Sequence, residues 1–263
     1  MEWTEEALEK LRKVPFFVRK RVKKQVEEYL KKQGKHRVDL ESFLEAKKVL
    51  LKKLSEAEKA FEISGCFGLN SCPNAITSSE GLLSSIEKLL KDERLGEFLL
   101  KKTNGNLKAH HRFKILLSEC PNACSQIYIA DIGIHGFMEP KVEQKLCTGC
   151  GLCEAACEEG AISIKEVAVI EQEKCIGCGD CVRACPEEAI KPVKKGYKVY
   201  AGGKLGRHPR LATYLATCFS DKEVLQLIAR IISVYKKFNL KGERLGSIIQ
   251  RIGWEDFKKK IFS

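Results

Sequence analysis

Twelve of the thirteen cysteines in this 263-residue chain fall into three sets of four, a pattern that constrains the fold more than any other feature. Two sets are compact runs with the spacing C-x2-C-x2-C-x3-C: Cys147, Cys150, Cys153 and Cys157, then Cys175, Cys178, Cys181 and Cys185. The third set is spread along the chain: Cys66, Cys72, Cys120 and Cys124. Four thiolates hold an iron–sulfur cluster only when they converge on one small volume. The chain must therefore fold so that each set comes together, and the compact runs indicate electron transfer.

The overall composition is typical of a folded soluble protein, with 44% hydrophobic and 31% charged residues. The first residues, Met1 to Glu6, are acidic and lack the basic and apolar segments of an export signal. No run of about 18 apolar residues is present, so a membrane-spanning helix is not expected. Without an export signal, so many cysteines favour metal binding in a reducing cytoplasm over disulfides.

The net charge of +12 would ordinarily suggest a nucleic acid or an anionic surface as partner. Bound metal centres change this sum, because each oxidised 4Fe-4S cluster with four thiolates carries about −2. Three such clusters offset roughly half of the positive charge, and a polycarboxylate cofactor would offset more. We therefore expect no nucleic acid and no membrane among the partners.

Helical patterns dominate residues 1–60. Thr4, followed by two glutamates, indicates a helix start. Apolar residues at helical spacing predict a second helix over residues 15–32. A third helix is expected from Asp39 to about Phe61. This section contains no cysteine, so we expect a separate N-terminal helical module.

Short apolar strands and polar turns alternate over residues 61–137, interrupted by a predicted helix from Ser79 to about Leu100. Beyond the cysteine runs, residues 197–200 predict a strand. A helix over residues 220–237 is indicated by its buried stripe and a capping box. The last forty residues suggest no chemistry.

Residues 138–194 carry an internal repeat of 28 residues, which places the two compact cysteine runs in equivalent positions. Glycines within the runs allow the backbone to curl around a cubane cluster: Gly149, Gly151, Gly177 and Gly179. In two-cluster bacterial ferredoxins, the fourth thiolate of each cluster comes from the other run. The expected ligand sets are thus Cys147, Cys150, Cys153 and Cys185, and Cys175, Cys178, Cys181 and Cys157. A structural zinc ribbon is the alternative, although zinc sites rarely use eight cysteines at this spacing.

The spread cysteine set resembles the signature of the siroheme-dependent sulfite and nitrite reductases, because both parts of it contain a Cys-Pro-Asn element. These elements are Cys72-Pro73-Asn74 and Cys120-Pro121-Asn122-Ala123-Cys124. The resemblance implies that the four cysteines hold a third 4Fe-4S cluster and that Cys124 bridges it to the siroheme iron. It also implies that Asn74 and Asn122 lie against the cofactor.

Two flanking segments extend this resemblance. Arg112-Phe113-Lys114 is similar to the basic pair that binds the anionic substrate, and on a strand the two cations share a face. Arginine does not give up its proton, so Lys114 is the better proton donor. Residues 200–210 resemble the glycine-rich siroheme loop, with the candidates Gly202, Gly203, Lys204, Gly206, Arg207 and Arg210. The alternatives are ordinary strand residues and a solvated cationic loop. A structural role for His110 and His111 is as reasonable as proton delivery.

The resemblance implies an α+β fold, in which a siroheme-reductase half-domain with a mixed sheet (residues 61–137 and 195–263) receives a ferredoxin insertion (residues 138–194). The implied activity is reduction of sulfite to sulfide, or of nitrite, with Arg112, Lys114 and Lys204 at the substrate. Electrons enter from an external donor through the ferredoxin clusters. The family joins two such halves, and this chain has one, so we expect a homo-oligomer with siroheme near the interface between its copies.

Two other functions stay open from the sequence. Residues 3–48 resemble a small helical domain of the dark-operative protochlorophyllide reductase B subunit, which suggests a reductase acting on a larger substrate such as a tetrapyrrole; the alternative for this module is an amphipathic helical hairpin that only packs. A non-catalytic electron carrier without siroheme is the other possibility. The thirteenth cysteine, Cys218, lies in an apolar stretch and is expected to be a buried thiol.

Overall fold

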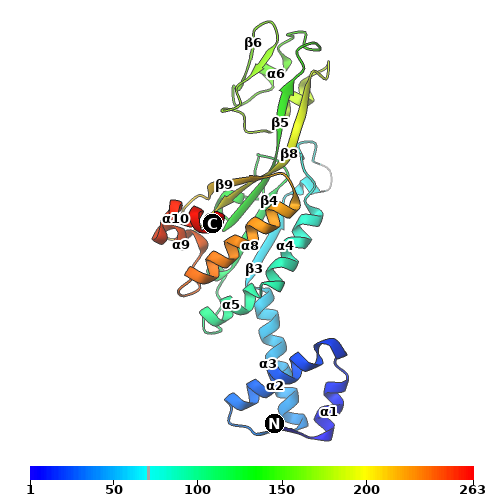
Figure 1. Cartoon of the computed structure of the whole chain (residues 1–263), viewed down its shortest axis with the longest axis vertical. Coiled ribbons are helices and arrows are strands. Elements are labelled where there is room, and N and C mark those ends of the chain that lie inside the picture. The colour runs from blue at the N-terminus through cyan, green and yellow to red at the C-terminus, as the bar shows by residue number, and fades with distance from the viewer. Residues whose placement is uncertain (70–71) are drawn as a thin grey trace. The chain divides into compact units, whose positions relative to one another are not determined.

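The computed structural model describes residues 1–69 and 72–263, and the side chains in these ranges except those of residues 17, 53–58 and 69. It divides into two compact units, Met1–Lys59 and Ala60–Ser263 (Figure 1). Among the described helices, none combines the length and the apolar character needed to span a membrane.

The first unit is a three-helix module with the helices α1 (Glu5–Arg12), α2 (Phe16–Lys32) and α3 (Leu40–Glu58). The Thr4 hydroxyl caps α1 by accepting a hydrogen bond from the Ala7 amide at 3.4 Å. The helices enclose a small apolar core: Ala7, Leu11, Val26, Leu30, Val38, Phe43 and Ala46. Two short strands, β1 (Glu2–Trp3) and β2 (Arg37–Val38), pair in parallel. The sequence did not indicate them because two residues show no periodicity.

The second unit is built on a five-stranded mixed sheet, which confirms the expected α+β class. The strands are β3 (Phe61–Gly65), β4 (Phe113–Ser118), β5 (Ile132–Val142), β8 (Ile190–Ala201) and β9 (Thr213–Cys218). They neighbour one another in this order. β3, β4 and β5 run parallel, whereas β8 is antiparallel to both β5 and β9. Parallel neighbours bring the carboxyl ends of β3 and β4 to one edge, where the spread cysteines follow.

Helices pack on this sheet and bury the main core. They are α4 (Glu80–Asp92), α5 (Leu95–Lys102), α8 (Asp221–Phe238), α9 (Leu245–Ile252) and α10 (Trp254–Phe262). α4 and α8 lie side by side across the sheet (Figure 1). Their apolar faces enclose strand residues such as Leu117 and Ile134. Cys218 is buried in the same core, as expected.

The single helix expected from Ser79 to about Leu100 is wrong, because the chain breaks it into α4 and α5. Arg94 separates them with a left-handed backbone, φ 52°, and pairs with Glu97 in the next turn. The third helix of the N-terminal module likewise ends at Glu58, and Phe61 begins β3 instead. Both boundaries depend on tertiary contacts that periodicity does not contain.

The ferredoxin section lies between β5 and β8, at the far end of a long two-stranded ribbon (Figure 1). It contains α6 (Leu152–Ala155), β6 (Ile162–Ile164), β7 (Ala168–Ile170) and α7 (Asp180–Ala184). The boundaries expected at residues 138 and 194 fall inside β5 and β8. These two strands continue from the sheet into the ferredoxin section, and their register shifts between Glu139 and Pro140.

Candidate functional site

The two compact cysteine runs line two separate cavities, and each run contributes three thiols to one cavity and one to the other. The first cavity is lined by Cys175, Cys178, Cys181 and Cys157. The second is lined by Cys147, Cys150, Cys153 and Cys185. This grouping is the one expected from two-cluster ferredoxins, and ligation of a cluster in each cavity stays a prediction.

The chemistry around these thiols suits cluster binding. Backbone amides donate to three sulfurs: Ala161 to Cys157 at 3.3 Å, Ala168 to Cys147 at 3.4 Å and Ala189 to Cys185 at 3.3 Å. Such hydrogen bonds stabilise negative charge on cluster sulfurs. Burial raises the pKa of Cys178 to about 11 and that of Cys181 to about 12. Loading with metal must therefore displace protons from these thiols.

The spread set converges at the carboxyl ends of β3 and β4. Cys66 follows β3, and its amide donates to the Leu117 carbonyl of β4 at 3.0 Å. The Cys66 sulfur accepts hydrogen bonds from the amides of Gly68 at 3.4 Å and Glu119 at 3.2 Å. Burial raises the pKa of Cys120, and the nearby thiols of Cys124, Cys66 and Cys72 raise it further. Four cysteines from distant segments thus share one neighbourhood.

Within the described ranges, no three His, Cys, Asp or Glu side chains are close enough together to hold a single metal ion. The fit of the cysteine sets to polynuclear clusters rests instead on the shared cavities and on the thiol chemistry described above.

A groove of about 500 Å³ opens beside Cys66 and Cys124. Among the described residues, the charged side chains of its lining are Glu62, Lys114 and Arg244. Cys124 is exposed here, whereas Cys120 is buried. The groove therefore combines a reachable thiol with two cations, which suits an anionic ligand or cofactor.

Lys114 occupies the groove as the sequence suggested, but its ammonium already has a partner. Glu62 stands opposite Lys114 in the parallel register of β3 and β4. The Lys114 Nζ lies 2.9 Å from Glu62 Oε2. Arg112 precedes β4 and is half-buried, and it is not among the described residues that line the groove.

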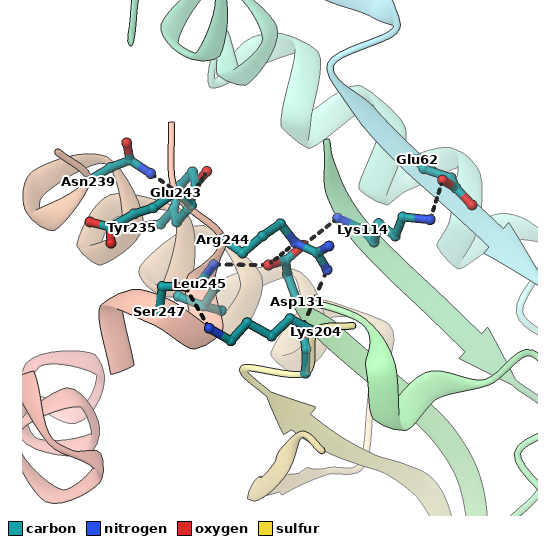
Figure 2. A network of polar contacts seen from close by, with 11 residues as sticks. Glu62, Lys114, Asp131, Lys204, Tyr235, Asn239, Glu243, Arg244, Leu245 and Ser247 are labelled. Atoms are coloured by element: carbon teal, nitrogen blue, oxygen red, sulfur yellow. Dashed lines mark hydrogen bonds and ion pairs between the residues drawn. The ribbon is translucent and has the colours of Figure 1, made fainter. Parts of the chain in front are cut away.

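Asp131 holds one side of the groove together (Figure 2). Its buried carboxylate accepts hydrogen bonds from the amides of Lys114 at 2.8 Å and Leu245 at 2.9 Å. Arg244 Nε donates to the same carboxylate at 2.7 Å, and Arg244 Nη2 donates to the Gly203 carbonyl at 3.4 Å. Burial raises the pKa of Asp131, while the Arg244 charge and these donors act in the opposite direction. Asp131 thereby couples β4 to the start of α9.

Two hydrogen bonds to the residue before Arg244 hold the turn that precedes α9, and so fix the position of Arg244. The Tyr235 hydroxyl and the Asn239 side-chain amide both donate to the Glu243 carbonyl, at 3.0 and 2.9 Å (Figure 2). Sequence reasoning missed both Arg244 and Asp131. No local motif marks them, because their roles arise from contacts between segments more than a hundred residues apart.

The glycine-rich loop packs largely against the protein itself. A side chain at Gly203 would meet the Tyr128 carbonyl oxygen at 2.4 Å, and one at Gly202 would meet Ile249 at 2.7 Å. Lys204 and Arg210 exchange two backbone hydrogen bonds of 2.9 Å. The first two glycines therefore make room for the chain's own atoms.

The remaining sequence candidates are not among the described residues that line the groove, and they differ in exposure. Lys204 is buried, and its ammonium donates to the Ser247 hydroxyl at 2.9 Å (Figure 2). Gly206 has open space around it. Arg207 and Asn122 are exposed, and Asn74 is half-buried.

Arg210 Nη2 donates to the Thr213 hydroxyl at 3.3 Å. His110 and His111 stack edge to face with ring centroids 4.2 Å apart. Of the loop, the groove lining contains Leu205.

An α+β fold with a mixed sheet, together with three sets of cysteines that each come together, is typical of an iron–sulfur protein. Residues 56–263 match the family described as "Nitrite and sulphite reductase 4Fe-4S domain", so the chain belongs to this family. Residues 3–47 match the family described as "Proto-chlorophyllide reductase 57 kD subunit". Both resemblances found in the sequence are therefore confirmed.

Curated relatives cover most of this chain. The Coenzyme F420-dependent sulfite reductase of Methanocaldococcus jannaschii is 37% identical over 196 residues, which cover 72% of this chain and 30% of the relative. One of the subunits of the anaerobic sulfite reductase of Salmonella typhimurium is 29% identical over 209 residues, covering 76% of this chain and 57% of the relative. The chain thus spans less than two thirds of the length of each of these two proteins.

The fold is also found among solved structures, for example in the crystal structure of dissimilatory sulfite reductase I, with a TM-score of 0.52 and 17% identity. The match covers 76% of this chain and 52% of that one. At this identity the likeness supports the arrangement of sheet and helices alone.

Proposed function

We propose that this protein reduces a small oxyanion, most directly sulfite to sulfide, at a siroheme held in the groove. The observation that carries the proposal is that the exposed thiol of Cys124 and the cations Lys114 and Arg244 line the same groove. Membership in the nitrite and sulphite reductase family supports it. The two relatives named as sulfite reductases favour sulfite over nitrite.

The donors around the groove fit the proposed cofactors. Thiols of Cys66, Cys72, Cys120 and Cys124 would hold a 4Fe-4S cluster, and Cys124 is the exposed one. Siroheme carries several carboxylates, for which Arg244 and the cationic loop with Arg207 and Arg210 would supply positive charge. Bound there, siroheme would supply the iron chemistry of the multi-electron reduction, while the protein orients the anion and delivers protons.

The ferredoxin section would supply the electrons, and one of its two sites adjoins the third cysteine set. Met138, Ile76 and Cys120 form one buried apolar cluster, against which Val182 packs. Val182 is next in sequence to Cys181, and the Met138 amide donates to the Gly177 carbonyl at 3.0 Å. We therefore propose that the site of Cys175, Cys178, Cys181 and Cys157 faces the third set, and that the other site accepts electrons from an external donor.

A homo-oligomer is part of this proposal. Phe67 and Leu205 line the groove and are 92% and 61% exposed. Large apolar side chains that are exposed together at a binding site are typical of a surface that another molecule covers, and we propose a second copy of the chain. A light-scattering mass equal to the monomer for the loaded protein would contradict the oligomer.

Anaerobic purification with iron and siroheme tests the function directly. The expected result is a tetrapyrrole absorbance spectrum that changes on adding sulfite, together with oxidation of reduced viologen that starts with sulfite. Faster oxidation with nitrite would reassign the substrate. Iron near twelve atoms per chain without tetrapyrrole absorbance would favour an electron carrier, and a spectrum insensitive to both anions would favour a larger substrate.

A further inference from the structure

We propose that Glu62 is a positioning residue that holds the Lys114 ammonium in the groove and returns a proton to it during turnover. The inference rests on the proposed reduction of an oxyanion in this groove. It concerns a carboxylate on a strand that carries no recognisable motif in the sequence.

The geometry begins with strand register. β3 and β4 are parallel, and Glu62 pairs with Lys114, so both side chains leave the sheet on the same face. Both line the groove, with 2.9 Å between Oε2 and Nζ. In the part of the lining that the structure describes, the other titratable or charged groups are Cys66, Cys124 and Arg244.

The two groove cations differ in how their charge is balanced. Arg244 is balanced by the buried Asp131, which is not among the described lining residues. Lys114 is balanced by Glu62, whose side chain is 40% exposed inside the groove. Glu62 is therefore the carboxylate that an incoming anion meets.

The chemistry requires repeated proton delivery. Reducing sulfite to hydrosulfide takes six electrons and seven protons and releases three waters. An arginine does not donate its proton, so Lys114 is the proton donor among the cations of the described lining. Its N–H bond breaks as the proton passes to a departing substrate oxygen. The neutral amine must then regain a proton, and a carboxyl group 2.9 Å away that also reaches solvent can pass one on.

Glu62 also fixes the direction of a flexible side chain. A lysine ammonium has three N–H donors, and one directed at Glu62 leaves two for the substrate. The same negative charge repels an anion in the groove. A carboxylate in this role therefore weakens anion binding while it supports turnover, and a merely structural residue has no reason to do both.

The test compares Glu62→Gln, Glu62→Asp and the matched control Glu93→Gln. Glu93 is also 40% exposed and also pairs with a lysine, with 2.7 Å between Lys236 Nζ and Glu93 Oε2, but neither residue is part of the groove lining. Sulfite affinity is measured on the oxidised, loaded protein by absorbance without a reductant. Turnover is measured with reduced viologen, which supplies the electrons, across a pH series.

For Glu62→Gln we expect sulfite to bind several-fold more tightly, while kcat falls roughly tenfold and its pH profile changes shape. Glu62→Asp should recover part of kcat, and Glu93→Gln should match the unmodified protein in both measurements. Weaker or unchanged sulfite binding in Glu62→Gln overturns the proposal, as does an unchanged kcat.

These outcomes are separable from failure of the proposed function. If the unmodified protein turns over neither sulfite nor nitrite, the function is wrong, and the proton-return role of Glu62 falls with it. The affinity comparison still reports whether Glu62 opposes an anion in the groove. If the unmodified protein turns over and Glu62→Gln behaves like Glu93→Gln, only the Glu62 proposal is wrong.

Discussion

The ferredoxin section and the groove are both candidate redox sites in one unit, yet they are built in opposite ways. In the ferredoxin section, one continuous segment, residues 147–189, supplies the thiols, the glycines and the amide donors. In the groove, the lining comes from β3, β4, the segment after Cys120, the glycine-rich loop and Arg244. A local site survives as long as its own segment folds, whereas a site assembled from distant segments depends on the whole core.

The ion pairs of the two regions also differ, because the pair behind the groove is buried and the pair in the ferredoxin section is exposed. Asp131, behind the groove, is completely buried and pairs with Arg244, whose side chain is 14% exposed. Asp180 in the ferredoxin section pairs with Arg183 at 2.6 Å, but both side chains are over a third exposed. Buried ion pairs are expensive to break, and exposed ones contribute little.

The largest expected effect separates the two sites by their metal content. Cys150→Ala should lower iron by about four atoms per chain and leave the siroheme absorbance in place, because its cluster site is local. Cys124→Ala should remove the siroheme absorbance as well. Iron analysis and absorbance spectra of the two anaerobically loaded variants make the comparison. Loss of siroheme absorbance in Cys150→Ala would show that the sites are not independent.

Breaking the buried pair should have the next largest effect. Asp131→Asn leaves the Arg244 guanidinium without its counter-charge, and we expect the free energy of unfolding to fall by about 3–5 kcal/mol. Asp180→Asn is the control in the ferredoxin section, where the expected loss is below about 1 kcal/mol. Urea unfolding followed by circular dichroism measures both. Equal losses would mean that burial does not distinguish the two regions.

Substitution of a closely packed glycine behind the groove should change the free energy of unfolding by less. A second glycine, which has open space around it, should change it in the opposite direction. Gly203→Ala places a methyl group against the Tyr128 carbonyl oxygen, and we expect a loss of about 1–3 kcal/mol. Gly81→Ala in α4 meets no neighbour within 4 Å and should gain about 0.4–1 kcal/mol through reduced chain entropy. Thermal unfolding of both variants checks the opposite signs. A neutral Gly203→Ala would mean that the loop moves freely.

The last effect is absent at neutral pH and concerns Cys218, a thiol outside both sites. Burial raises its pKa from 9.0 to about 11. The unfolded chain loses this proton above about pH 9, whereas the folded protein keeps it until about pH 11. The thiol's contribution to stability is therefore complete below pH 9 and is lost as the pH rises through 11, by roughly 3 kcal/mol at most. Unfolding of Cys218→Ala beside the unmodified protein should give a flatter pH dependence in this window.

Sequence reasoning succeeded where the chemistry is local. The likeness to two-cluster ferredoxins predicted that the fourth cysteine of each run joins the other run, and Cys157 and Cys185 do line the cavities of the other run. Thr4 was recognised as a helix cap from its neighbours. It failed where a boundary depends on packing, as at Arg94, which divides the helix expected from Ser79 to Leu100. It also assigned no chemistry to the last forty residues, although Arg244 lies there and lines the groove.

By itself, the sequence determined the three cysteine sets, the α+β class and the family, because spacing and short motifs carry that information along the chain. The tertiary structure decided which charges share the groove. Parallel pairing of β3 and β4 places Glu62 beside Lys114. The buried Asp131 pairs with Arg244, which is more than a hundred residues away in the sequence. Such pairings follow from strand register and from the cost of leaving a charge unpaired in the core, and neither is visible until the chain has folded.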